Sequence, residues 1–204
     1  FTNTRQVRVY GETGTDHTQD MSTIEVTDLS KSYGDVQALD DVSFTIPDGE
    51  FVVLLGQSGA GKSTLLRCLN GITRPTEGSI SIDGTEVLGP RNDVAMIFQQ
   101  HYILEQMSAY SNALTGALGR TSFLGSLFGR YGDDDKQEAL RALDTVGLLD
   151  EAHQRAGNMS GGQQQRVGIA RALVQEPNLL LADEPVASLD PASAETVMRY
   201  IRDA

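Results

Sequence analysis

A glycine-rich segment at residues 56–64 constrains the fold of this chain more than any other feature. It reads Gly-Gln-Ser-Gly-Ala-Gly-Lys-Ser-Thr, follows the apolar run 51–55 and precedes a helical pattern from Lys62 to Asn70. Such glycine spacing lets the backbone curl so that successive N–H groups point inward, where the positive end of the next helix adds to them. The segment therefore predicts a phosphate-binding loop between a buried strand and a helix.

Separate roles are predicted for the residues of this loop. Lys62 would supply a positive charge to the β- and γ-phosphates of a nucleotide, and the Ser63 hydroxyl would be a ligand for Mg²⁺. A chance glycine loop is the alternative, but the strand pattern before it and the helix pattern after it favour a nucleotide site. Further contacts to the phosphates are expected from Gly56, Ser58, Gly59, Ala60, Gly61 and Thr64.

The apolar run 179–182 ends in an Asp-Glu pair. Burying an unpaired carboxylate is costly, so an acid directly after a buried strand needs a partner. We expect Asp183 to bind Mg²⁺, directly or through a ligand of the ion, and Glu184 to polarise the water that attacks the γ-phosphate. An ordinary acid near a helix start is the alternative for Glu184, but the adjacent Asp183 and Pro185 favour the catalytic interpretation.

Upstream of this pair, the sequence Ser160, Gly161, Gly162, Gln163 begins a helical pattern that continues to Val174. Serine is suited to cap a helix, and two glycines expose backbone N–H groups, so the segment predicts a second anion site. A second phosphate site within one copy would be redundant. We therefore expect each nucleotide to lie between two copies arranged head to tail, with an ordinary capped helix as the alternative.

The remaining pattern predicts an α/β fold with two kinds of strand. Alternating apolar and polar residues at 24–29, 42–46 and 79–82 predict antiparallel strands with one solvent-facing side. The runs 51–55 and 179–182 do not alternate, and they predict strands buried on both faces, as in a parallel sheet. The fold class is therefore a P-loop core with an antiparallel β subdomain.

Helical patterns predict two further helices, at 134–146 and 192–201. The stretch from about 99 to 158 has a helical pattern and no buried strand, which indicates a helical subdomain. Residues 1–22 are polar and aperiodic, and they predict a disordered extension before a nucleotide-binding domain at 23–204. The apolar side of the helix at 134–146 is expected to consist of Ala139, Leu140, Leu143 and Val146.

The amino-acid composition limits the kinds of partner that this chain is expected to bind. The net charge of −12, from 28 acidic and 16 basic residues, argues against nucleic acid as a partner. The apolar runs fall short of the roughly 18 residues that cross a bilayer, and the N-terminus lacks a secretory signal, so a cytoplasmic location is expected. Only three of the 16 basic residues are lysines, which is typical of salt-loving microbes or of a GC-rich genome that favours arginine codons.

The segment that begins at Ser160 resembles the signature of ATP-binding-cassette (ABC) proteins, with Met159 in place of the usual leucine. The resemblance extends from about Ile24 to Ala204. It implies an ABC ATPase that binds ATP and Mg²⁺ and works as a dimer of two copies.

The same resemblance implies roles for three more residues. Tyr33 resembles the aromatic residue that stacks on adenine. Gln99 resembles the glutamine that senses Mg²⁺ and the attacking water, so it joins both the catalytic and the metal-binding sets. Asp190 ends a segment, 187–190, that resembles the loop crossing the dimer interface.

Segments 96–100, 116–121, 160–167 and 182–190 also resemble the ATP-binding subunits of phosphonate importers. This resemblance implies uptake of phosphonate or a related phosphorus oxyanion, energised by a peripheral subunit at the cytoplasmic face of the cell membrane. The implied partners are transmembrane permease subunits and, indirectly, an extracytoplasmic solute-binding protein.

Three other functions are alternatives to phosphonate import. The chain could be an importer ATPase for another small solute, a soluble ABC ATPase that acts in DNA repair or on the ribosome, or a non-catalytic regulatory module. The sequence has neither the long coiled coil of repair proteins nor a second cassette. Intact Lys62, Asp183 and Glu184 argue against the regulatory module. The family also carries a γ-phosphate-contacting histidine after the catalytic glutamate. None of the three histidines follows Glu184, so we expect the sequence to be C-terminally truncated.

Overall fold

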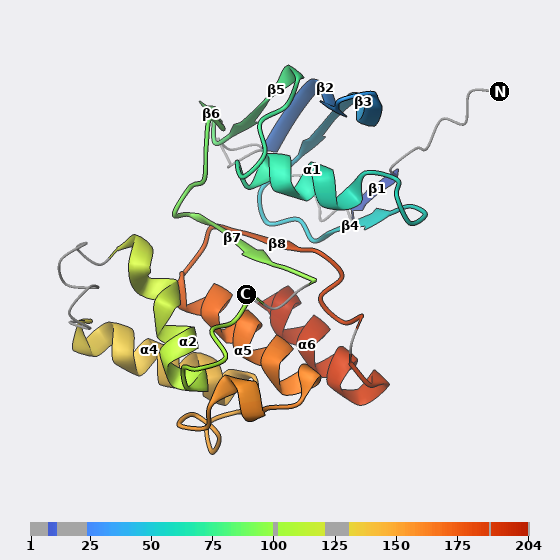
Figure 1. The fold of residues 1–204 in the computed structure, drawn as a ribbon. Helices are drawn as coiled ribbons and strands as arrows, with labels where there is room; N and C mark the ends of the chain where they lie inside the picture. Colours follow the sequence, from blue (N-terminus) through green and yellow to red (C-terminus); the bar gives the residue numbers. More distant parts are fainter. Residues whose placement is uncertain (1–7, 12–23, 100–101, 121–130, 188, 204) are drawn as a thin grey trace. The chain divides into compact units, whose positions relative to one another are not determined.

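The structure, a computed structural model, describes residues 8–11, 24–99, 102–120, 131–187 and 189–203. The chain divides into two compact units, residues 1–91 and 92–204. Figure 1 shows the helices and strands of each unit.

The first unit contains a four-stranded antiparallel sheet in the order β3-β2-β5-β6. The prediction of antiparallel strands with one solvent-facing side is confirmed, because residues along the start of β2 alternate between buried and exposed. Figure 1 shows α1 beneath this sheet. The strands are β2 (Ile24–Tyr33), β3 (Val36–Ile46), β5 (Glu77–Ile82) and β6 (Thr85–Glu86).

A bulge in β2 preserves the buried face of this sheet. Ile24 and Val26 are buried, and the pairing register with β3 shifts between Val26 and Leu29. Asp28 lies within the shift and adopts the left-handed φ of 49°. A bulge adds one residue to a strand and so reverses the side on which the next residues point. As a result Leu29, at an odd spacing from Val26, is also fully buried.

The pairing and exposure of strand β4 (Val52–Leu55) differ from the prediction. It pairs antiparallel with β1 (Arg8–Gly11), and Val53 and Leu55 are 40% and 54% exposed. The expectation of a parallel strand buried on both faces is therefore wrong for the run 51–55. An unbroken apolar run predicts a strand, but it does not determine which segment pairs with it.

The same pairing corrects part of the expectation for residues 1–22, of which only four lie in the described residues. Arg8–Gly11 form strand β1 where we expected a disordered extension. Val and Tyr are both enriched in strands, and a neighbouring strand edge offers them backbone partners.

Helix α1 (Lys62–Leu69) forms where it was predicted. It buries Leu65, Leu66, Cys68 and Leu69, and Gly71 follows at a left-handed φ of 77°. This conformation favours glycine and ends the helix.

The second unit is built on two parallel strands, β7 (Val94–Ile97) and β8 (Leu179–Ala182), paired in register from Val94–Leu179 to Ile97–Ala182. All four residues of β7 are buried. The prediction that 179–182 forms a strand of a parallel sheet is confirmed, but its predicted burial on both faces is not, because Leu181 alone of the four residues is buried. Figure 1 shows α5 and α6 on one side of this pair.

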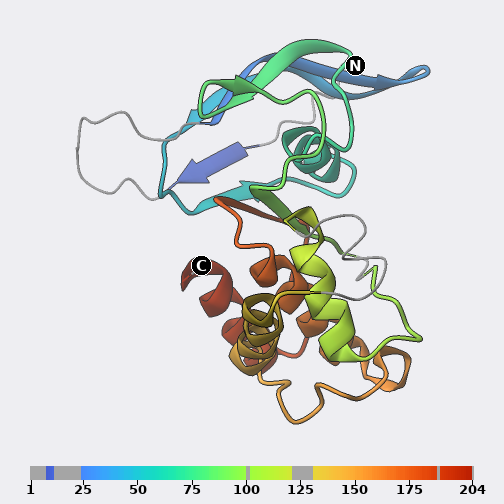
Figure 2. The same cartoon turned by 90° about the vertical axis from the view of Figure 1, so that its left-hand side faces the viewer.

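Helices of the second unit share one hydrophobic core with these strands. Helix α5 contacts α2, α4 and β7, and Figure 2 shows α2 and α4 beside it. The predicted helices at 134–146, 162–174 and 192–201 correspond to α4, α5 and α6. The elements are α2 (Ala109–Leu114), η1 (Thr115–Gly119), α4 (Asp133–Thr145), η2 (Ala156–Asn158), α5 (Gly161–Val174) and α6 (Pro191–Asp203).

Two details of the helical prediction differ in the structure. Leu140 is 38% exposed, whereas Ala142 joins Ala139, Leu143 and Val146 in the core. A residue at the border of a helical stripe can point either way, so periodicity alone misplaces it. The helices of residues 99–158 also pack on α5 and belong to the same compact unit as β8.

Candidate functional site

The glycine-rich loop of the first unit connects β4 to α1. Residues 56–59 are exposed, whereas Ala60 is buried at the base of the loop, and the Ala60 amide donates to the carbonyl of Gln57 (3.1 Å). Gly59 and Gly61 have left-handed φ values of 77° and 93°. Both values lie where side chains are disfavoured, so the curl of the loop depends on glycine at these positions.

Lys62 lies across the mouth of this loop. Its Nζ donates to the carbonyl oxygens of Gly56 (2.6 Å) and Gln57 (3.2 Å). Helix α1 begins here without a side-chain cap or an acidic residue in its first turn. By helix geometry, the first amides of a helix point out of its N-terminus and not at a carbonyl of the same helix. Positive charge and N–H donors therefore gather at one place, which is the chemistry that binds phosphate.

Gly61 fixes this loop against the β2–β3 hairpin. A Cβ atom at Gly61 would lie 2.4 Å from the carbonyl oxygen of Ala38 in β3. Tyr33 ends β2 at the turn of the same hairpin, and its ring is 48% exposed. The Nζ of Lys31 lies 5.0 Å from the centroid of this ring. The hairpin therefore presents a half-exposed aromatic ring with a cation–π contact from Lys31.

At the carboxyl ends of the two parallel strands, the second unit brings three predicted residues together. The Asp183 amide donates to the Ile97 carbonyl (2.9 Å), which continues the β7–β8 ladder by one residue, and Asp183 is only 5% exposed. Glu184 is exposed and has a left-handed φ of 51°. Gln99, two residues beyond β7, donates from Nε2 to Oε2 of Glu184 (2.9 Å).

Ser160 caps helix α5 as predicted. Its Oγ accepts from the amide of Gln163 (3.2 Å), and Oε1 of Gln163 accepts from the amide of Ser160 (3.0 Å). This reciprocal pair is a capping box. The amides of Gly161 and Gly162 remain without acceptors inside the helix. Apart from its chain neighbours and the backbone of its own helix, no described residue comes within 4 Å of where a Gly161 Cβ would lie.

The loop between β8 and α6 approaches this helix tip. A Cβ atom at Gly162 would lie 3.1 Å from Cδ2 of Leu189. Asp190 directly precedes α6, and its carbonyl accepts from the amide of Ala194 (2.8 Å). The predicted signature segment and interface loop are therefore neighbours within one copy.

Two polar side chains of α5, half-buried Arg171 and fully buried Gln165, were missed by the sequence reasoning. Arg171 donates from Nη1 to the carbonyl of Tyr102 (2.7 Å), and burial lowers the pKa of its guanidinium. Gln165 is 2% exposed and donates from Nε2 to the carbonyl of Pro185. Gln165 shares a face with Gly168, Ile169 and Ala172, which are all buried. A lone amide in such an apolar stripe was the available signal.

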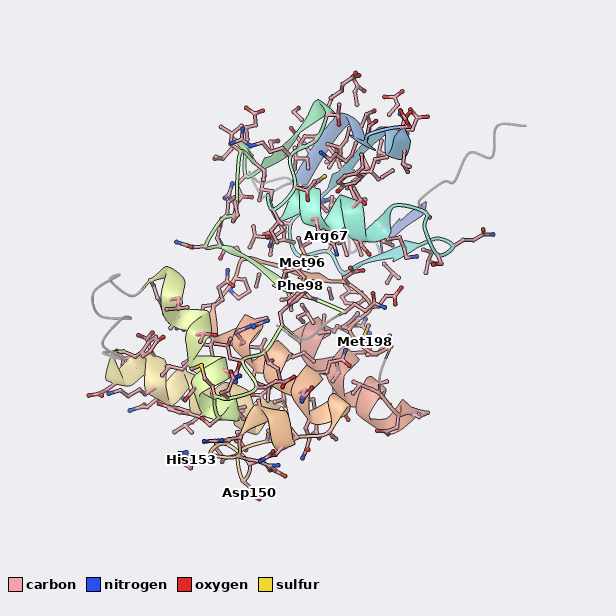
Figure 3. The ribbon with its side chains drawn as sticks, in the orientation of Figure 1. Arg67, Met96, Phe98, Asp150, His153 and Met198 are labelled. Atoms are coloured by element: carbon pink, nitrogen blue, oxygen red, sulfur yellow. The ribbon has the colours of Figure 1, made fainter. Side chains whose placement is uncertain are left out.

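Some polar groups lie away from the strand ends. Figure 3 shows His153 and Asp150 at the opposite end of the second unit from Met96 and Phe98. Within the described ranges, His, Cys, Asp and Glu side chains form no group of three or more that could hold a metal ion. None of the helices in these ranges combines the length and the apolar character that a bilayer-spanning segment requires.

The predicted ligands for Mg²⁺ fit the ion by donor chemistry. Ser63, Gln99 and Asp183 offer hydroxyl, amide and carboxylate oxygens, the donors that Mg²⁺ prefers. Gln99 uses its Nε2 on Glu184, which leaves its amide oxygen to act as an acceptor. Ser63 belongs to the first unit, and the other two residues belong to the second.

A phosphate loop and an acidic strand end are common to many P-loop NTPases, whereas the capped, glycine-tipped helix at Ser160 narrows the class to ATP-binding cassettes. The ABC transporter family profile matches residues 39–187. The chain therefore belongs to the ABC transporter family.

Similar proteins agree with this assignment. The chain is 74% identical over 184 residues to the phosphonates import ATP-binding protein PhnC of Halobacterium salinarum, covering 90% of this chain and 66% of that protein. It is 64% identical to PhnC 2 of Haloquadratum walsbyi, with 90% and 65% coverage. The dimeric ATP-binding cassette MJ0796 with bound ADP and Pi superimposes with a TM-score of 0.74 at 29% identity, covering 87% of this chain and 81% of that one.

The chain spans about two thirds of the length of the first curated relatives that it matches, between 61% and 66%.

Proposed function

We propose that this chain is the ATP-hydrolysing part of an ABC importer subunit that energises uptake of phosphonate or a related phosphorus oxyanion. The observation that carries the catalytic proposal is the hydrogen bond between Gln99 and Glu184, which holds an exposed carboxylate at the ends of two parallel strands. The identity of 74% to a protein named for phosphonate import supports the substrate class.

In the proposed reaction, ATP lies with its phosphates on the loop at residues 56–64 and its adenine on Tyr33. Lys62 neutralises charge on the β- and γ-phosphates, and Glu184 accepts the proton of the attacking water. Mg²⁺, held by Ser63, Gln99 and Asp183, would supply charge neutralisation at the same phosphates. Hydrolysis yields ADP and phosphate.

The tip of α5 supports a dimer in which each nucleotide is shared. The helix start at Gly161 is exposed, and its first amides have no acceptor within the helix, which is where negatively charged groups bind. Two copies arranged head to tail would close the Ser160 segment of one copy over the γ-phosphate bound by the other, with Asp190 at the interface. The matched cassette with ADP and Pi is dimeric, which supports this arrangement.

Membrane association would come through partners. We propose that the subunit is peripheral, at the cytoplasmic face of the cell membrane, where transmembrane permease subunits receive the motion of the ATP-driven dimer. A solute-binding protein outside the membrane would deliver the solute to these permeases.

Mixing two inactive variants tests the shared site, using the protein expressed from the whole reading frame. Lys62→Ala removes the phosphate charge, whereas Gly161→Asp adds a repelling carboxylate at a position with open space. In a head-to-tail dimer of the two variants, one of the two sites is intact. It combines the unchanged phosphate loop of the Gly161→Asp copy with the unchanged helix tip of the Lys62→Ala copy. We expect each variant alone to lack ATPase activity and the mixture to recover it in part.

A control mixture uses Lys136→Ala, which removes an exposed lysine paired with Asp133, in place of Lys62→Ala. Failure of the active-site mixture to regain activity, with wild type active, would count against sharing. An inactive wild type would count against the ATPase itself.

A further inference from the structure

The amide of Gln165 is buried in the second unit and bonds to the chain just after the catalytic carboxylate. Gln165 is 2% exposed, and its Nε2 donates to the carbonyl oxygen of Pro185. Its Oε1 atom has no hydrogen-bond partner among the described residues. A buried polar atom left without a partner destabilises the folded chain, because it loses its hydrogen bonds to water and gains none in return. An apolar residue would avoid this cost, so the amide at this position calls for a function.

Pro185 has only one backbone group that can form a hydrogen bond. Proline has no N–H group, so its carbonyl is its only backbone group for hydrogen bonding, and Gln165 uses it. On either side of Pro185, the Asp183 amide donates to Ile97, and the Ala187 amide donates to the carbonyl of Glu184 (3.2 Å). The bond from Gln165 thus fixes the peptide group between Pro185 and Val186, the second peptide group after Glu184.

Glu184 needs such a support because of its backbone conformation. Its φ of 51° is left-handed, a region that residues with side chains rarely adopt. Conformations of this kind persist only where the surroundings fix them, and they gather at functional sites. Gln99 holds the carboxylate from one side, and Gln165 holds the backbone from the other.

We propose that Gln165 is a positioning residue for Glu184, and that through this bond helix α5 sets the direction in which the carboxylate points. The proposal rests on the function proposed above, in which Glu184 activates water. Helix α5 begins with the Ser160 segment, which contacts the nucleotide bound by the partner copy. The buried amide of Gln165 therefore links this helix to Glu184, the carboxylate that acts on the nucleotide bound by its own copy.

Gln165→Met in the protein from the whole reading frame separates this role from a structural one. Methionine has a similar length, removes the orphaned Oε1 and leaves one carbonyl without its donor, so the costs offset and the melting temperature should change little. Misplacement of a catalytic group by about 1 Å costs on the order of 100-fold in rate. We expect kcat for ATP to fall by about 10- to 100-fold, with KM for ATP within about twofold of wild type.

Gln175→Met is the matched control. Gln175 follows the same helix, and its Nε2 donates to the carbonyls of Asn92 (2.9 Å) and Val94 (3.0 Å), at the opposite end of α5 from the Ser160 segment. Its kcat should equal that of wild type. In the Glu184→Gln background, Gln165→Met should leave ATP-dependent dimer formation unchanged, because binding does not use the carboxylate.

An unchanged kcat in Gln165→Met would overturn the proposal while leaving the ATPase function intact. So would an equal loss in Gln175→Met, or a loss of kcat that accompanies an equally large rise in KM and a lower melting temperature. Absence of ATP hydrolysis by the wild type would instead refute the proposed function.

Discussion

The side-chain amide of Gln99 donates to the carboxylate of Glu184 across 2.9 Å, although 85 positions separate the two residues in sequence. The contact arises because β7 and β8 run parallel and in register, so the residues that follow them meet at the same edge. One strand end supplies the carboxylate, and the other supplies the group that orients it.

Replacing Gln99 tests whether this hydrogen bond matters for hydrolysis. Gln99→Met removes the donor, and Gln99→Glu replaces it with a carboxylate that repels Glu184 but keeps an oxygen ligand. A hydrogen bond to a charged group is worth about 1.5–3 kcal/mol, so we expect both variants to lower kcat by roughly 10- to 150-fold. Steady-state phosphate release measures this.

Gln154→Met is the control, because the side-chain Nε2 of exposed Gln154 donates to the Asn158 carbonyl, near Ser160 but outside the strand ends. Full activity in Gln99→Glu would mean that the oxygen ligand, and not the contact with Glu184, is what Gln99 contributes.

Gly78 and Gly84 form a matched pair for testing the bulge in β2. Both have left-handed φ values, 78° and 67°, but a Cβ at Gly78 would lie 2.3 Å from the Asp28 carbonyl oxygen, whereas Gly84 faces open space. Gly78→Ala should therefore cost roughly 1–3 kcal/mol more than Gly84→Ala, through overpacking added to the same backbone penalty. Urea unfolding followed by circular dichroism compares them, and equal losses would refute the bulge geometry.

Burial raises the pKa of the Cys68 thiol above its ordinary value of 9.0. Because the pKa is higher in the folded chain, the thiol of the unfolded chain loses its proton first as pH rises. The contribution of Cys68 to the free energy of unfolding is therefore fully present below pH 9.0 and declines as pH rises above it. We expect the free energy of unfolding to fall more steeply between pH 8 and about pH 10.5 in wild type than in Cys68→Ala. Parallel slopes in urea titrations would contradict this expectation.

Potassium chloride should raise the melting temperature. The net charge of −12 comes from 28 acidic and 16 basic residues, and carboxylates that repel one another destabilise the compact state until salt screens them. We expect a rise between about 0.1 M and about 2 M KCl, over which the Debye length falls below roughly 3 Å. Sucrose of equal osmolality is the control, and a flat response would favour the codon explanation for the arginine excess.

Much of the fold follows from local pattern. Alternation located β2, β3 and β5, and the helical period with glycine stops located α1, α4, α5 and α6. The pairing of β4 with β1 did not follow, because the choice of partner depends on segments that are distant in sequence. Leu140 lay at the border of a helical stripe, where period does not decide exposure.

The residues of the candidate site also divide into those that local sequence pattern identifies and those that it does not. Loop and cap residues such as Lys62 and Ser160 were identified because their function depends on neighbours in sequence. Gln165 was missed because its partner, Pro185, is 20 residues away and offers only a backbone carbonyl. Short motifs report local geometry, whereas a supporting side chain is recognised only by what it touches.

The open space at Gly161 makes this position suited to a reporter group. The single cysteine of this chain, Cys68, is buried, so a cysteine introduced at 161 would be its one accessible thiol. A Cβ atom at this position meets no described atom within 4 Å beyond its own helix and chain neighbours, so the side chain that carries a small dye can start there without a clash. The emission of this fluorescent dye would then change when a second copy brings its triphosphate to the tip, and closure of the pair could be followed in real time.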